Sequence, residues 1–304
     1  MAKQYRTVDH YLKWAHLGRH SIILHLLTVL VGYAILMYGF IVMLPVLQRF
    51  DFLTYYSQVR AHLDLIGSVL LMLLVVWLVL GRPGYSIISP SRKIYFKLFL
   101  LGTTVTVLTN LLNVFDFIPL HKVHYNGFDA AWAAGWPIIL LSAVGILIQT
   151  GFEEMYFRGI VMQATYRLTA YLVPVLFVQA IYFALLHIGN VSQWGTNLPV
   201  AIPYLLMALS FAYAAWRTGS LYLSWGLHFG NNLFLLMLVH PSGDVGNDVT
   251  PFTMEQPSLE HTILYNILVL VVVVLTTEFT LPKERRFKGI WKLPFYDTNA
   301  NDMV

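Results

Sequence analysis

Eight stretches of mainly apolar residues recur along this chain, and they constrain its fold more than any other feature. Each is close to the roughly 20 residues that a helix needs to cross a bilayer. Hydrophobic residues make up 58% of the 304 residues and charged residues only 11%, far from the composition of a soluble domain. The sequence therefore predicts an all-α, polytopic membrane protein with about eight transmembrane helices, which together form one integral membrane domain over residues 1–304. The stretches lie near residues 22–44, 63–80, 95–114, 136–152, 171–187, 200–216, 221–239 and 262–281.

Basic residues alternate along the loops between these stretches. The basic segments are the N-terminus, residues 82–97, residues 158–167, Arg217 and residues 283–292, whereas the intervening loops hold few cations and the last of them is acidic. Because Lys and Arg accumulate on the cytoplasmic side, both termini are expected in the cytoplasm. These segments account for the net charge of +4, so we expect the lipid bilayer and no nucleic acid as a partner.

Several familiar catalytic signatures are missing from the sequence. There is no cysteine, which excludes disulfides, thiolate catalysis and cysteine-bound metals. No H-E-x-x-H zinc helix, G-x-S-x-G elbow or G-x-G-D pattern occurs. We therefore expect neither a metal nor another cofactor.

Two adjacent carboxylates, Glu153 and Glu154, follow the fourth apolar stretch and precede Arg158. A charged side chain in the middle of a bilayer costs about 2.5 to 3.5 kcal/mol even on lenient scales, so such residues are rare unless they function. Residues four apart lie on one face of a helix, so Arg158 should pair with Glu154. Glu153 lies about 100° around the helix and remains available to another partner. A carboxylate without a cation beside it in apolar surroundings suits a general base.

Polar residues on two later helices complete a candidate site. His228 and Asn232 stand four apart on one face of the seventh helix, and both side chains can donate hydrogen bonds to the oxyanion of a tetrahedral intermediate. His187 on the fifth helix could hold an attacking water together with Glu153. A purely structural interpretation stays open, in which the histidines bond neighbouring helices and the Glu-Glu-Arg cluster is a buried ion pair with one protonated acid.

The depth of these residues in the membrane poses a problem for straight helices. At a rise of 1.5 Å per residue, His187 lies about 24 Å beyond Tyr171, while Glu153 is expected near the cytoplasmic face. The two meet only if the fourth helix continues past Glu153 or the fifth helix is tilted and begins after Tyr171.

Three motifs on separate helices resemble those of one protease family. Glu153-Glu154-Met155-Tyr156-Phe157-Arg158 resembles an E-E-x-x-x-R motif, residues 183–187 an F-x-x-x-H motif and residues 228–232 an H-x-x-x-N motif. In this order they are similar to the CPBP family, the CAAX protease and bacteriocin-processing proteins, also called Abi. The resemblance implies a metal-independent glutamic endopeptidase of the type II CAAX prenyl endopeptidase kind, with its catalytic core at residues 136–240.

The same resemblance implies roles for the site residues. Glu153 and His187 would activate water, His228 and Asn232 would form the oxyanion hole, and the pair of Glu154 and Arg158 would orient the site. The expected substrate is a membrane-associated peptide or protein in the cell membrane of a prokaryote, and whether it is prenylated or bears a leader is left open. Its cleavage position and the protein's oligomeric state are left open by the sequence.

Two functions of other classes are compatible with the same residues. One is a noncatalytic membrane scaffold or bacteriocin self-immunity factor, which would not need Glu153. The other is a transporter that uses the carboxylates and histidines as a proton relay. The sequence shows no internal repeat, which disfavours the transporter because many transporters are built from repeats.

Overall fold

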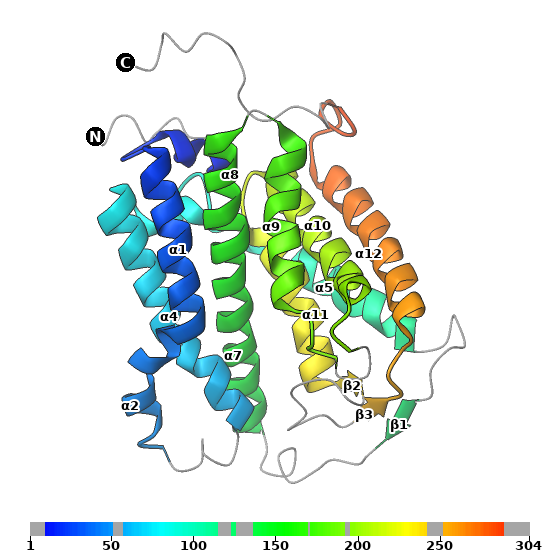
Figure 1. Cartoon of the computed structure of the whole chain (residues 1–304). Helices are drawn as coiled ribbons and strands as arrows, with labels where there is room; N and C mark the ends of the chain where they lie inside the picture. Colours follow the sequence, from blue (N-terminus) through cyan, green and yellow to red (C-terminus); the bar gives the residue numbers. More distant parts are fainter. Residues whose placement is uncertain are drawn as a thin grey trace.

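Helices occupy each of the eight stretches that the sequence predicts, and the all-α class is confirmed (Figure 1). The computed structural model describes residues 10–50, 57–114, 123–125, 136–169, 171–191, 195–241 and 252–288. The helices are α1 (Ile22–Tyr38), α4 (Ser57–Leu80), α5 (Phe96–Val114), α7 (Trp136–Glu154), α9 (Leu172–Leu186), α10 (Ala201–Thr218), α11 (Tyr222–Met237) and α12 (Leu259–Thr280).

The helices carry apolar surface on the outside of the bundle. Within the described residues, four helical segments are long and apolar enough to cross a membrane: His62–Leu80, Phe96–Asn113, Leu198–Thr218 and Leu259–Thr280. Large outward-facing side chains on α1 and α12 remain exposed, such as Ile23 at 72% and Leu264 at 67%. Soluble monomers rarely expose contiguous apolar patches, so this surface fits a lipid environment. The number of spans remains a prediction.

The fourth predicted helix does not end near Glu153. α7 runs without a break into the π-helical turn η5 (Met155–Val161) and then into α8 (Met162–Leu168), forming one rod about 50 Å long at 1.5 Å per residue. The prediction that residues 158–167 form a basic loop is therefore wrong. Arg158 is fully buried because Glu154, one turn earlier, balances its charge at 3.0 Å. Only Arg167 reaches the end of the rod, where it donates to the carbonyl of His20.

Because α7 continues into η5 and α8, Glu153 and His187 lie at the same depth in the bundle. Glu153 lies fifteen residues before the end of α8 at Leu168, and His187 lies fifteen residues after the start of α9 at Leu172. The two helices are antiparallel neighbours, so each residue is about 22 Å from the end of the bundle where α8 stops and α9 starts (Figure 1). The first of the two sequence alternatives is correct.

Close helix packing fixes α11 in place. A Cβ atom added at Gly230 would lie 2.6 Å from the carbonyl oxygen of Thr103, and one at Gly102 would lie 2.5 Å from the carbonyl oxygen of Leu223. The backbones of α5 and α11 therefore touch, as in membrane helices that pack through G-x-x-x-G motifs. Gly226 and Gly230 form such a motif around His228, a signal that the sequence analysis did not use.

The first and last described segments meet at the same end of the bundle (Figure 1). The backbone N–H of Tyr11, in the 3-10 helix η2 (Tyr11–His16), donates to Gly219 at the end of α10. Arg217 at that end forms a buried ion pair with Glu278 of α12 and also donates to the carbonyl of Arg285. The cytoplasmic placement of both termini remains a prediction, and residues 1–9, 242–251 and 289–304, used in the loop-charge analysis, lie outside the described part.

Short elements at the other end were not expected from the sequence. The predicted stretch 22–44 is divided into α1, the 3-10 helix η3 (Gly39–Val42) and a single turn, α2 (Leu44–Leu47). Three strands form a small sheet in the order β1-β3-β2, with β1 antiparallel and β2 parallel to β3. They are β1 (Val123–Tyr125), β2 (Val239–Pro241) and β3 (Phe252–Met254). Strands of three residues are too short to show an alternating pattern.

Candidate active site

The candidate site residues surround a cavity of about 240 Å³ between α7, α9, α10 and α11. Glu153, His187, His228 and Asn232 line it directly, whereas Glu154 and Arg158 lie buried behind it. The structure thus brings together all six residues that the sequence analysis singled out. The remaining lining residues are Gln149, Phe183, Asn190, Tyr204, Met207, Asn231, Leu235 and Leu236.

A buried charge pair forms the back wall of this cavity. Arg158 lies 3.0 Å from Glu154 Oε1, which confirms the predicted pairing, and both side chains are at most 1% exposed. The guanidinium is enclosed by aromatic rings, with Phe183 at 4.8 Å and Phe211 at 5.2 Å from its centre. Such contacts stabilise a cation that has lost its water. His228 Nδ1 lies 2.9 Å from the same Oε1 atom of Glu154.

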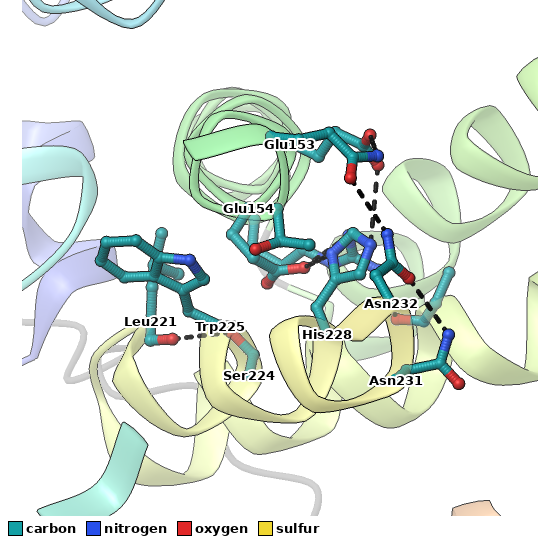
Figure 2. A network of polar contacts seen from close by, with 12 residues as sticks. Glu153, Glu154, Leu221, Ser224, Trp225, His228, Asn231 and Asn232 are labelled. Atoms are coloured by element: carbon teal, nitrogen blue, oxygen red, sulfur yellow. Dashed lines mark hydrogen bonds and ion pairs between the residues drawn. The ribbon is translucent and has the colours of Figure 1, made fainter. Parts of the chain in front are cut away.

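Glu153 lines the cavity, and Figure 2 shows it on the helix that faces His228 and Asn232. Its Oε2 atom is buried and makes no hydrogen bond among the described residues. The nearest ionisable groups are the Nε2 atoms of His187 at 3.9 Å and His228 at 3.7 Å. This carboxylate oxygen is therefore close to two imidazoles while remaining available to a further hydrogen-bonding molecule.

His187 is held at the C-terminal end of α9, where its Nδ1 lies 2.7 Å from the carbonyl oxygen of Phe183. Because a carbonyl only accepts hydrogen bonds, Nδ1 carries the proton. A neutral His187 then presents the lone pair of Nε2 to Glu153. The ring also stacks on Phe183 with centroids 3.9 Å apart, which fixes its plane.

Gln149 is a polar residue of the site that the sequence analysis missed. Its Nε2 donates to Glu153 Oε1 at 2.8 Å, and its Oε1 accepts from Asn232 Nδ2 at 3.2 Å. Asn231 in turn donates to Asn232 Oδ1 at 3.1 Å, along the face of α11 shown in Figure 2. Gln149 therefore connects the carboxylate of one helix with the carboxamide of another. The signal was present in the sequence, since Gln149 lies four residues before Glu153 in an otherwise apolar stretch.

The described side chains of the site are not spaced as a metal-binding cluster. Within the part of the chain that the structure describes, no group of three or more His, Asp or Glu side chains is placed to hold a metal ion. The donors and acceptors of the site instead contact one another or face the cavity.

Comparison with known proteins places the site within a recognised sequence segment. Residues 134–234 match the family model described as "Type II CAAX prenyl endopeptidase Rce1-like". The chain is also 31% identical over 177 residues to the "Uncharacterized protein YyaK" of Bacillus subtilis (strain 168), a match that covers 56% of this chain and 58% of that protein. No solved structure matches. The family segment contains all three motifs, and over these residues the similarity of the chain to the type II CAAX prenyl endopeptidase family is established.

Proposed function

We propose that this protein is an intramembrane endopeptidase of a prokaryotic cell membrane. It hydrolyses a peptide bond of a membrane-associated peptide or protein, and a prenylated chain and a leader-bearing peptide are two candidate substrates. The observation that carries the proposal is the free Oε2 atom of Glu153, which faces two imidazole nitrogens across a cavity inside a helical bundle. The family match over residues 134–234, to a family described as endopeptidases, supports the same reaction class.

The gap between Glu153 and His187 has the size of one water molecule. Two acceptors that are 3.9 Å apart subtend an angle of about 90° at an oxygen that lies about 2.8 Å from each of them. This angle is close to the angle between the two O–H bonds of water. Glu153 Oε2 and His187 Nε2 both act as acceptors, so a water placed there donates to both and keeps its lone pairs for attack.

The charges of the site call for one further proton. With both acids ionised, Glu153, Glu154 and Arg158 carry one negative charge in excess, which is unfavourable in an apolar interior. Glu154 Oε1 forms an ion pair with Arg158 and accepts a hydrogen bond from His228 Nδ1, so the single N–H of a neutral His228 is already used. His228 can donate from Nε2 only as an imidazolium. We infer that His228 carries the extra proton.

These assignments give a complete reaction. Glu153 takes a proton from the water, whose oxygen attacks the carbonyl carbon of the peptide bond. The oxyanion accepts hydrogen bonds from His228 Nε2 and from the second N–H of Asn232, whose first N–H donates to Gln149. Glu153 then returns the proton to the leaving nitrogen as the carbon–nitrogen bond breaks.

The remaining polar residues act as positioning groups in this proposal. Glu154 and Arg158 hold the ring of His228, and the aromatic cage holds Arg158 in turn. Gln149 holds Glu153 by its Oε1 atom, which leaves Oε2 directed at the water. Each group that would touch the reacting atoms is thus fixed by a hydrogen bond from a neighbouring helix or turn.

A comparison of peptide termini tests the proposal without knowledge of the substrate. Membranes are prepared from cells that express the wild type, Glu153→Gln or Glu260→Gln at matched levels, and new peptide termini are identified by mass spectrometry. Glu260 is exposed at the start of α12, so its variant is a control for the loss of one carboxylate. New termini are expected with the wild type and Glu260→Gln, and not with Glu153→Gln.

Two outcomes would count against proteolysis. Identical termini in all three preparations, with a cellular phenotype that Glu153→Gln retains, would favour the noncatalytic scaffold or immunity factor. Proton-coupled flux in proteoliposomes that depends on Glu153, without new termini, would favour the transporter.

A further inference from the structure

A second cavity, here called the side pocket, adjoins the cavity that holds Glu153. Its volume is about 140 Å³, and it lies between α5, α10, α11 and α12. Tyr204, Met207, Asn231 and Leu235 line both cavities, so the two are neighbours across a wall of four side chains. A peptide whose bond lies at Glu153 is therefore within reach of the side pocket.

The polar groups of the side pocket are largely occupied by the protein itself. Asn110 accepts from Tyr265 at 3.1 Å, and its Nδ2 donates to a carbonyl of its own helix. Asn113 Oδ1 lies 3.2 Å from His261 Nε2, and Asn266 donates to the carbonyl of Thr262. Gln256 also lines the pocket, and its buried Oε1 atom has no hydrogen-bond partner among the described residues. An entering group therefore meets mainly apolar surface together with this acceptor.

No charged side chain is available to a ligand there. Among the described residues that line the side pocket there is no Lys, Arg, Asp or Glu. Aliphatic and thioether side chains from several elements line the pocket, among them those of Val191, Met254 and Leu235. Because transfer of a charged group into such surroundings is costly, the pocket favours an uncharged apolar group.

The volume limits how much can enter. A cavity of about 150 Å³ lined by apolar side chains binds one benzene molecule, and the side pocket, at about 140 Å³, is of this size. It therefore has room for one side chain as large as that of Leu or Phe, and it is too small for a long lipid chain.

We propose that the side pocket is a specificity subsite that takes one large apolar side chain of the substrate, next to the bond that is cleaved. The proposal rests on the proposed peptidase function. Successive side chains of an extended peptide point to opposite sides, so a peptide laid along the larger cavity directs one side chain across the shared wall while its neighbour points away.

The test compares two substitutions on α12. Thr262 lines the side pocket, so Thr262→Phe places a ring in it. Leu264 lies two residues further on the same helix and is 67% exposed, so Leu264→Phe adds the same ring on the outside. The residues that flank the new peptide termini are recorded for both variants, the wild type and Glu153→Gln.

In the peptides cut by the wild type and by Leu264→Phe, one position next to the cleaved bond is expected to hold a large apolar residue. A synthetic peptide with Ala at that position should be cut at least about 10-fold less efficiently by the purified wild type, because each missing methylene in an apolar pocket costs that order. Thr262→Phe is expected to reverse the preference, so that it cuts the Ala peptide better than the parent peptide.

The outcomes separate this subsite from the proposed peptidase. Termini that depend on Glu153 but show no apolar preference, or a preference that Thr262→Phe leaves unchanged, would overturn the subsite alone. If Thr262→Phe does not fold, the subsite is still tested by comparing cleavage of the Ala peptide and of the parent peptide by the wild-type protein. Termini that do not depend on Glu153 would overturn the peptidase and the subsite together.

Discussion

Gly230→Ala probes whether the contact between α5 and α11 positions the catalytic groups. The added Cβ would lie 2.6 Å from the carbonyl oxygen of Thr103, so α11 has to move by about 0.8 Å to reach ordinary contact at 3.4 Å. His228 lies two residues before Gly230 and moves with it. A shift of this size lengthens its 2.9 Å contact with Glu154 to as much as about 3.7 Å, beyond hydrogen-bonding distance.

The expected result is a large loss of activity with a smaller loss of stability. A misplacement of about 1 Å in a catalytic site costs about 100-fold in rate, and overpacking a core costs about 1 to 3 kcal/mol. Cleavage of a peptide identified from the new termini gives the rate, and thermal unfolding in detergent gives the stability. Rates are compared well below the unfolding temperature of the variant, so that unfolding does not account for the loss.

Gly39→Ala is the matched control for this substitution. There the atom nearest to the new Cβ is the hydroxyl oxygen of Ser68, which can rotate away, and the next two atoms, Ile35 Cγ2 and Ser68 Cβ at 3.0 Å, are side-chain atoms that need to shift by only a few tenths of an ångström. The carbonyl of Thr103, in contrast, belongs to a helix backbone. We expect Gly39→Ala to retain most of its cleavage rate. If Gly230→Ala unfolds and cleaves as the wild type does, the reasoning about helix contact is refuted.

Three further substitutions test other contacts, each in purified protein. Gln149→Leu removes the bridge to Glu153 and should lower kcat about 10- to 100-fold with little change in KM or unfolding temperature; a change in KM alone would contradict a positioning role. Arg158→Lys keeps the charge but loses the planar group that fits the aromatic cage, so cleavage should fall although Glu154 retains a cation; unchanged cleavage would show that charge alone suffices. Glu278→Gln breaks a buried ion pair and should lower the free energy of unfolding by about 3 to 5 kcal/mol, whereas the exposed control Glu284→Gln should not; equal unfolding of the two would argue against the pair.

The helices and the local pairing could be predicted because both depend on short sequence separations. Apolar runs identify the helices, and the spacing of four residues is enough to pair Glu154 with Arg158. The three motifs place their residues on separate helices, but only the fold shows that their side chains meet. The roles of those residues remain predictions.

Other features were missed for physical reasons that differ from case to case. Arg158 was assigned to a loop because its burial also depends on Phe183 and Phe211, which belong to other helices and which sequence alone does not place around it. The pair of Arg217 and Glu278 joins residues 61 positions apart, beyond the reach of helical spacing. The glycines at 226 and 230 were visible as a pattern, but only the partner helix shows what they contact.

If the proposed peptidase takes its substrate from the end of the bundle where α8 stops, the depth of Glu153 sets a minimum length for that substrate. A chain that enters from the end where α8 stops crosses about 22 Å before its bond reaches the carboxylate. An extended segment covers that distance with about seven residues, since it advances about 3.3 Å per residue, whereas a helix needs about fifteen residues. Under the proposed function, a substrate anchored at that surface by a lipid or a charged group would need at least this many residues between its anchor and the bond that lies at Glu153.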